Sequence, residues 1–240
     1  MSAPAIFGGD VSFVDPLEAR PESTAVVVTD MQLSNTSLEH GVNRALDRIR
    51  PGSVDYIDAR VRGVVLPAVT RLLRASRERG VVVIYLALGS AYRDLRDMTP
   101  RTRGFVRRLE AASGIEDILW RGDPGYAFCP EIAPRDSDIV VRKTAWGAFN
   151  SSALEQVLRD RRIDTILMSG VTTNCCVETT ARDAADRGYG VAIVEDCVAD
   201  FDLAAHQAAL DAFRFNFGHV LPSVESATTL LDASSGAGQA

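Results

Sequence analysis

Short apolar runs alternate with amphipathic stretches along this chain. Six runs, rich in β-branched residues and bounded by turn or charged residues, predict strands. The predicted strands cover residues 25–29, 81–87, 139–141, 165–169, 190–194 and 219–221. Amphipathic patterns between them predict helices over residues 59–78 (with a break at Pro67), 152–160, 175–187 and 204–215.

The strand-forming runs V-V-V-T and V-V-V-I-Y-L are apolar without a polar face. Strands of this kind are covered by helices on both sides. Together with the strand and helix alternation, this predicts one α/β domain, a three-layer, doubly wound (Rossmann-like) sandwich. Its six-stranded, mostly parallel sheet would be flanked by helices.

Three segments lack a stable periodic pattern. Residues 33–52 follow the first strand, and loops longer than about 12 to 15 residues are usually functional, so this segment is a candidate lid. Residues 91–126 carry many arginines and acids and are candidates for specificity or for an oligomer contact. Which residues of either segment set specificity is left open. The low-complexity end D-A-S-S-G-A-G-Q-A predicts a disordered tail.

Composition excludes several classes of function. The formal charge of -6 and the pI near 5.1, without a basic run interleaved with aromatics, argue against a nucleic-acid partner. The first residues lack the basic and apolar regions of a signal peptide. The longest apolar run, residues 81–88, is too short to span a bilayer. We therefore expect a cytoplasmic protein without membrane contact.

Two adjacent cysteines stand where the strand over 165–169 turns into a helix. The chain has four cysteines, too few for a disulfide scaffold, so we expect free thiols at Cys129, Cys175, Cys176 and Cys197. Amides at a helix start favour anions, and a thiol placed there is expected to ionise more easily. A small buried side chain is the competing interpretation, and each cysteine of the pair could fill one role. Asn174 is expected to cap this helix.

The residues that follow the predicted strands bring an acid, a lysine and a thiol to one edge of the sheet, where doubly wound proteins bind ligands. These strand ends are Asp30, 89–90, 142–143, 170–176 and 195–196. Lys143 is the only lysine among 26 Lys and Arg residues, which indicates either a site that needs a compact charge or chance survival on a solvated face. A carboxylate can take a thiol proton, an ammonium group favours both anions, and the thiolate can attack a carbonyl.

Three motifs resemble the isochorismatase-like cysteine hydrolases, which include nicotinamidases, N-carbamoylsarcosine amidohydrolase and ureide amidohydrolases. They are T-D-M-Q at 29–32, V-V-R-K-T-A-W-G-A-F-N at 140–150 and S-G-V-T-T-N-C-C-V-E-T-T-A-R-D-A at 169–184. The resemblance covers roughly residues 23–231, which we take as the hydrolase domain. Residues 1–22 would then be an N-terminal extension, and residues 232–240 the disordered tail.

The resemblance assigns a role to each residue of the catalytic trio. Asp30 would be the acid and base, Lys143 would hold the charges in place, and Cys176 would be the nucleophile with Cys175 packed behind it. A cis peptide bond before Thr172 is implied as well. The backbone amides of Thr172 and Cys176 would form the oxyanion hole.

The chain departs from parts of the family pattern. Nicotinamidases carry a metal site built from an acid and histidines after the second strand, where this chain has L-A-L-G-S-A-Y-R-D, so we expect no metal and no other cofactor. The vinyl ether hydrolases of the family lack a cysteine at position 176, so Cys176 favours C–N hydrolysis.

The resulting hypothesis is a metal-independent cysteine amidohydrolase. It would cleave a C–N bond of a small amide, ureide or carbamoyl compound through a thioester-type intermediate. The alternatives are an isochorismatase-type vinyl ether hydrolase and a catalytically silent binding or redox-sensing module. Its expected partner is a small-molecule substrate, and the resemblance implies a homodimer or homotetramer.

Residues beside the trio are candidate substrate contacts. Gln32 could donate to a substrate carbonyl, although a turn contact explains it equally well. Trp146 and Phe149 could form an apolar wall of the pocket, a subunit contact or part of the core. The acids at 195–196 and the lone His206 are interpreted as structural or surface residues.

Overall fold

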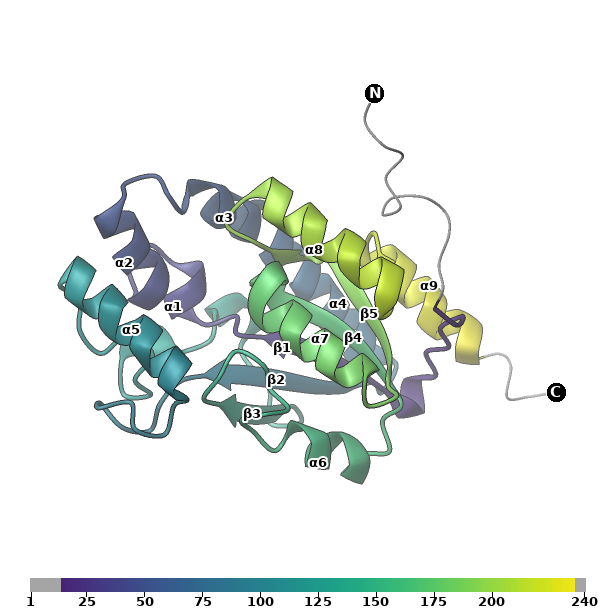
Figure 1. Cartoon of the computed structure of the whole chain (residues 1–240). Coiled ribbons are helices and arrows are strands. Elements are labelled where there is room, and N and C mark those ends of the chain that lie inside the picture. Colours follow the sequence, from purple (N-terminus) through teal and green to yellow (C-terminus); the bar gives the residue numbers. More distant parts are fainter. Residues whose placement is uncertain (1–13, 236–240) are drawn as a thin grey trace.

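The computed structural model describes residues 14–235 and contains one sheet between two layers of helices (Figure 1). The strands are β1 (Thr24–Thr29), β2 (Val82–Leu88), β3 (Ile139–Lys143), β4 (Thr165–Val171), β5 (Gly190–Ala199) and β6 (His219–Leu221). Their order is β3-β2-β1-β4-β5-β6, and every neighbouring pair runs parallel. The predicted six-stranded, doubly wound sandwich is confirmed.

Successive residues of the central strands face opposite layers. Val26 and Val28 pack in the core beneath α3 (Asp55–Arg60), α4 (Leu66–Glu78) and α9 (Val224–Ser235). Ala25 and Val27 pack in a second core beneath α6 (Leu154–Asp160), α7 (Glu178–Ala185) and α8 (Leu203–Asn216). Because both faces are buried, the strands read as continuous apolar runs.

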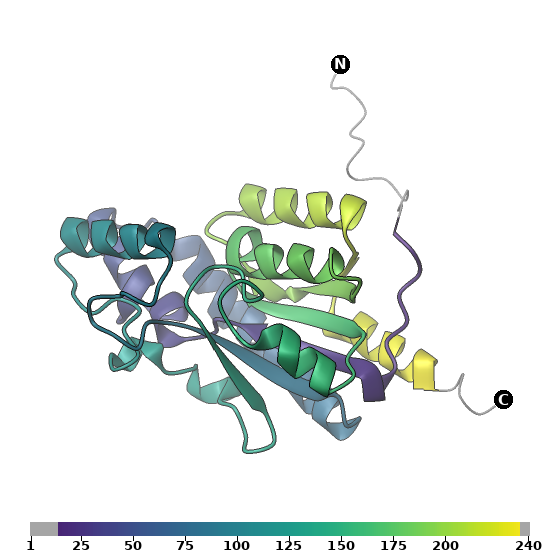
Figure 2. The same cartoon turned by 60° about the horizontal axis from the view of Figure 1, so that its bottom comes forward.

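A group of helices, the cap, stands beyond the carboxyl ends of the strands (Figure 2). It consists of α1 (Leu33–Thr36), α2 (Gly41–Ile49) and α5 (Pro100–Ser113). Val42 and Ala45 of α2 share an apolar cluster with Val106 and Leu109 of α5. The expectation that residues 33–52 and 91–126 lack regular structure was therefore wrong. The apolar residues of α2 recur at helical spacing but only over nine residues, and the buried face of α5 includes Thr102 and Ser113, so both periodic signals are easy to miss.

The helix before β2 is not broken at Pro67. It runs from α3 through a π-helical turn, η2 (Val61–Val65), directly into α4. Proline lacks an amide proton, and its ring crowds the carbonyl four residues earlier, which here is that of Gly63 inside the π-helical turn. The irregular turn lies before Pro67 and lets the helix continue.

The end of β5 and the state of residues 232–235 differ from the predictions. β5 continues past the acids at 195–196 to Ala199, with a shift of register against β4 between Met168 and Gly170. α9 continues to Ser235, so residues 232–235 are helical rather than part of a disordered tail. The rest of the predicted tail, and residues 1–13 of the predicted extension, lie outside the described residues.

The remaining elements are short. They are the 3-10 turns η1 (Pro21–Ser23), η3 (Pro124–Tyr126) and η4 (Pro130–Ile132), and the π-helical turn η5 (Thr173–Val177). Within residues 14–235, no helix is both long enough and apolar enough to cross a membrane.

Candidate functional site

The strand order reverses between β1 and β4, which lie side by side in the middle of the sheet. Gly170 makes the close approach of their carboxyl ends possible. Its φ is +105°, and a Cβ atom at this position would lie 2.0 Å from the carbonyl oxygen of Thr29. Only glycine fits such a position. Asp30 and the turn that carries Cys176 therefore meet at the switch point, the usual ligand site of doubly wound folds.

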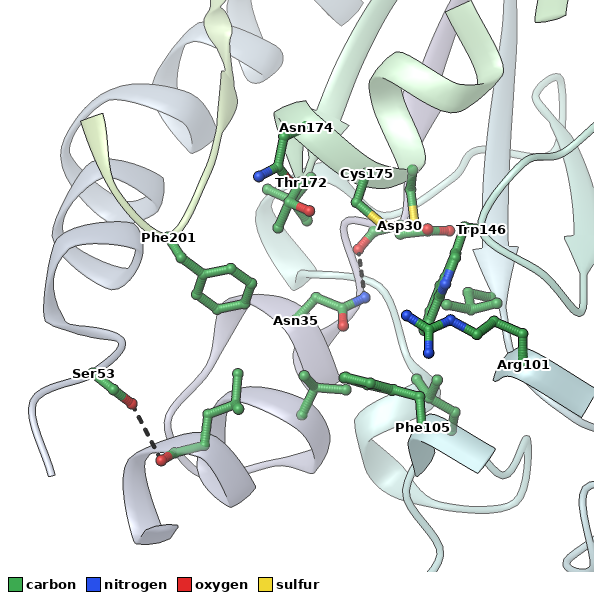
Figure 3. Close-up of a pocket in the computed structure, with 16 residues that line it drawn as sticks. Asp30, Asn35, Ser53, Arg101, Phe105, Trp146, Thr172, Asn174, Cys175 and Phe201 are labelled. Carbon is green, nitrogen blue, oxygen red and sulfur yellow. Dashed lines mark hydrogen bonds between the residues drawn. The ribbon is translucent and has the colours of Figure 1, made fainter. Parts of the chain in front are cut away.

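A cavity of about 510 Å³ lies between this edge of the sheet and the cap (Figure 3). Asp30, Thr172, Cys175 and Cys176 lie at its sheet end, and Trp146 forms part of its wall. The remaining lining residues are Asn35, Val42, Leu46, Ser53, Leu88, Arg101, Phe105, Leu119, Val171, Asn174 and Phe201. The peptide bond between Val171 and Thr172 is cis.

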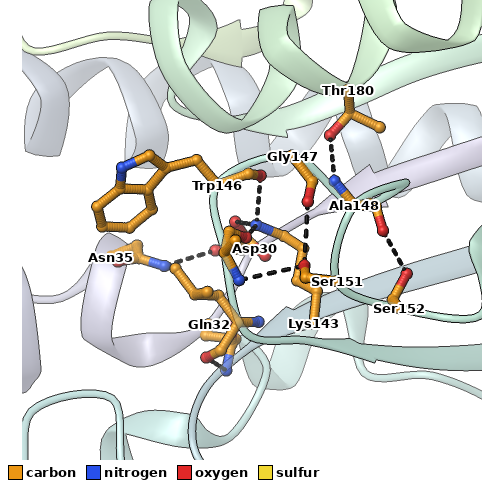
Figure 4. Close-up of polar contacts among 12 residues, drawn as sticks. Asp30, Gln32, Asn35, Lys143, Trp146, Gly147, Ala148, Ser151, Ser152 and Thr180 are labelled. Carbon is orange, nitrogen blue, oxygen red and sulfur yellow. Dashed lines mark hydrogen bonds and ion pairs between the residues drawn. The ribbon is translucent and has the colours of Figure 1, made fainter. Parts of the chain in front are cut away.

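Asp30 and Lys143 form a buried ion pair at the floor of the cavity (Figure 4). Nζ of Lys143 lies 2.8 Å from Oδ2 of Asp30, and the two side chains are 0% and 1% exposed. The ammonium group also donates to the carbonyl oxygens of Ala145, at 3.0 Å, and Trp146, at 2.8 Å. Its three protons therefore have three acceptors, which offsets the cost of burying the charge.

Burial and pairing act in opposite directions on these two groups. Burial raises the pKa of Asp30, while the charge of Lys143 and hydrogen bonds from Lys143 and the Cys176 thiol oppose that rise. Burial disfavours the ammonium form of Lys143, but Asp30 and Cys176 raise its pKa above the ordinary value. The lysine is therefore a permanent cation, and Asp30 is a carboxylate that accepts a proton more readily than one in water.

The Cys176 thiol is harder to ionise than the sequence predicted. A hydrogen bond with Cys175 and complete burial raise the pKa of Cys176 well above its ordinary value. The same hydrogen bond lowers the pKa of the half-buried Cys175. The amides of Cys175 and Val177 already donate to the carbonyl oxygen of Thr172. These two amides are therefore not available to stabilise a thiolate, and resting Cys176 is a thiol.

Asp200 caps η5, the turn that carries Cys176, in place of Asn174. Its Oδ2 accepts from the backbone amide of Asn174 at 2.6 Å, and its Oδ1 accepts from that of Phe201 at 2.8 Å. Asp200 follows the true end of β5, while the acids at 195–196 lie within the strand. Because β5 continues past its charged residues to Ala199, the sequence did not predict the position of Asp200 at the strand end.

Asn35 of α1 is a second residue that the sequence did not single out. Its Nδ2 donates to the backbone carbonyl of Asp30 at 3.1 Å. The backbone carbonyl of Asn35 in turn accepts from Nδ2 of Asn43 at 2.8 Å. Asp30 has a φ of +50°, in the left-handed region that a non-glycine residue adopts only when its surroundings hold it there. α1 therefore helps to hold the backbone of Asp30 in this conformation.

Two of the predicted substrate contacts do not reach the cavity. Gln32 is fully buried; its Oε1 accepts from the amide of Leu88 at 2.8 Å, and its Nε2 donates to the carbonyl of Tyr126 at 2.9 Å. Phe149 belongs to the core beneath α6 and α7, and its ring faces that of Tyr189. Both predictions were wrong, because Gln32 bonds to backbone groups near the strand ends and Phe149 packs in the core. Trp146 lines the cavity, and its contact with substrate stays a prediction.

His206 is buried and contacts Thr173 of η5. Arg60 Nη2 lies 3.1 Å from its Nε2, and Oγ1 of Thr173 lies 2.9 Å from its Nδ1. A guanidinium group can only donate, so Nε2 accepts and the proton resides on Nδ1, which donates to Thr173. Burial, and then the charge of Arg60, lower the pKa of His206 to about 4.

Acid is expected to weaken the fold through His206. The unfolded chain binds a proton below about pH 6.5, but the folded chain does so only near pH 4, so stability is present above that window and is lost as pH falls through it. The loss is at most about 3 kcal/mol. Urea unfolding between pH 7 and pH 4 should show a smaller decline for His206→Gln than for the wild type. Equal declines would contradict this account.

The comparisons with known proteins identify the family of this chain. Among residues 14–235, no three His, Cys, Asp or Glu side chains are grouped as metal ligands would be. A family model described as "Isochorismatase domain" matches residues 24–225. Ureidoacrylate amidohydrolase RutB of Pseudomonas syringae pv. syringae is 28% identical over 222 residues, covering 90% of this chain and 86% of that protein. The protein of the same name from Azorhizobium caulinodans is 30% identical over 205 residues, covering 81% of each.

Solved structures agree with the sequence relatives. A cysteine hydrolase from Pseudomonas syringae pv. phaseolicola matches with a TM-score of 0.74 and 27% identity, covering 98% of this chain and 100% of that one. N-carbamoylsarcosine amidase from Thermoplasma acidophilum matches with a TM-score of 0.61 and 25% identity, covering 85% and 97%. The family model spans the whole sheet and the switch point, and on this basis the chain belongs to the isochorismatase family of hydrolases.

Proposed function

We propose that this protein is a cysteine amidohydrolase that cleaves a C–N bond of a small amide, ureide or carbamoyl compound. One observation carries the proposal: a carboxylate paired with a buried lysine lies beside a thiol at the floor of a cavity. The names of the relatives, ureidoacrylate amidohydrolase and N-carbamoylsarcosine amidase, describe C–N hydrolysis of ureido and carbamoyl compounds and support the same chemistry.

The reaction begins with a proton transfer from Cys176 to Asp30. Because burial raises the pKa of Asp30, the proton is held there at lower cost than on a carboxylate in water. The sulfur attacks the substrate carbonyl as the proton leaves, so free thiolate need not accumulate. Lys143 remains charged throughout and stabilises whichever of the two neighbours is anionic.

The amides of Thr172 and Cys176 hold the oxyanion of the tetrahedral intermediate. The C–N bond then breaks, and ammonia or an amine leaves with the proton from Asp30. Water, deprotonated by Asp30, hydrolyses the thioester or thiocarbamate on Cys176. Both products are released, and the thiol regains its proton.

A substrate panel tests the proposal. We expect ammonia or amine release from at least one ureide, carbamoyl compound or small amide, at equal rates with and without a chelator. Acid quenching during turnover should trap an acyl or carbamoyl group on Cys176, visible as a mass increase on its peptide and absent from Cys176→Ala. Pyruvate release from isochorismate without any C–N hydrolysis would instead establish the vinyl ether reaction.

A further inference from the structure

Arg101 places an uncompensated positive charge on the wall of the cavity. It stands in the first turn of α5, and its side chain reaches in beside Trp146 and Phe105 (Figure 3). Within residues 14–235, no hydrogen bond, ion pair or ring contact engages its guanidinium group. Asp30, the other charged residue that lines the cavity, is already paired with Lys143. The site therefore carries one net positive charge.

The surroundings of this charge are mainly apolar. Phe105 and Trp146 meet edge to face, with ring centroids 5.3 Å apart and planes at 84°. Phe201 lies on the opposite side of the cavity (Figure 3). Leu88 and Leu119 complete the wall near the sheet. Such walls favour a flat apolar group, while Arg101 itself is exposed and free to meet an anion at this wall.

The other polar groups of the wall are neutral or already engaged. Asn35 donates to the backbone of Asp30, and Oγ of Ser53 donates to the carbonyl of Leu46. Asn174 is an uncharged amide at the rim. A single anionic group on the ligand would therefore have one matching partner, Arg101. Its planar guanidinium group can donate two parallel hydrogen bonds to the two oxygens of a carboxylate.

We propose that Arg101 binds a carboxylate of the substrate. This inference rests on the proposed function and narrows its substrate to an amide or ureide that carries a carboxylate and a flat apolar body. The carboxylate would pair with Arg101, the body would lie between Phe105, Trp146 and Phe201, and the scissile carbon would lie over Cys176. α5 would thereby select the substrate without taking part in bond breaking.

The first test compares N-carbamoyl-phenylalanine with its uncharged alcohol, N-carbamoyl-phenylalaninol. Arg101→Met keeps the apolar stem and should lower kcat/KM for the acid by about 10- to 100-fold, mainly through a higher KM. The alcohol should change by less than about threefold. Arg108→Met is the matched control, because Arg108 lies on the same helix, is exposed and does not line the cavity. Equal losses for acid and alcohol would overturn the proposal.

A binding measurement separates this inference from the proposed function. Calorimetry should show that the wild type binds cinnamate about 10-fold or more tightly than cinnamyl alcohol, and that Arg101→Met removes the preference. That result without any hydrolysis would support Arg101 and count against the amidohydrolase. Hydrolysis without any acid preference would leave the enzyme assignment intact and overturn the role of Arg101, as would a failure of cinnamate to bind.

Discussion

Replacing Cys176 with alanine is expected to abolish turnover, with kcat falling by about 10⁴-fold or more, while Cys175→Ala stays within about 10-fold of the wild type. Cys176 is the buried thiol beside Asp30, and it would form the covalent intermediate. Cys175 only lines the cavity beside it. Steady-state ammonia release measures both variants, and thermal unfolding shows whether each remains folded. Similar losses from both substitutions would contradict the assignment of the nucleophile.

Although Cys176 matters more for turnover, we expect Cys175 to react faster with an alkylating reagent. In the wild type, limiting iodoacetamide is expected to label Cys175 first, because its pKa is lowered and its side chain is only half buried. Cys175→Ala removes the hydrogen bond that contributes most to the raised pKa of Cys176, so Cys176 should then be labelled faster. Peptide mapping by mass spectrometry gives both rates. The more reactive thiol in the resting protein is thus not the proposed nucleophile.

Breaking the Asp30–Lys143 pair should cost both activity and stability. Asp30→Asn leaves an unpaired ammonium group, and Lys143→Met leaves an unpaired carboxylate, each in a fully buried place. Each substitution is expected to lower the free energy of unfolding by about 3 to 5 kcal/mol and kcat by about 10³-fold or more. Urea unfolding and ammonia release measure the two effects separately.

The double variant Asp30→Asn, Lys143→Met distinguishes a catalytic from a structural role. It removes both charges, so most of the lost stability should return, while activity should remain absent. A stability loss equal to the sum of the two single losses would show that the pair is not coupled. Recovery of activity together with stability would show that the pair serves only the fold.

The sheet and its reactive edge were predictable because their signals are local. Strands covered on both sides are continuous apolar runs, and polar residues directly after them, such as Asp30 and Lys143, stand out. The cap was not predictable in the same way. The buried face of α5 includes Thr102 and Ser113 beside its apolar residues, so its helical period is faint. The contacts of Gln32 were not predictable either, because its buried carbonyl partners come from distant segments.

The ionisation of the cysteines could not be predicted from the sequence either. A helix start predicts a lowered pKa, but the outcome depends on the hydrogen bond between Cys175 and Cys176 and on how deeply each is buried. The role of Asp200 depends on β5 continuing through charged residues, which the register shift against β4 allows. Contacts of this kind arise from tertiary packing, and a single sequence gives no local sign of them.

The cap comes from two segments that leave the sheet after β1 and β2, whereas Asp30, Lys143 and Cys176 all stand at or directly after strand ends. In the proposed mechanism, the bond-breaking trio and the Arg101 contact therefore lie on separate stretches of the chain, and Trp146 and Phe201 border the ligand from outside the cap. Substitutions in α2 and α5 can remodel the cavity wall while the trio keeps its geometry. For protein engineering, exchanging these two segments between relatives offers a route to new amidohydrolase specificities on an unchanged reaction centre.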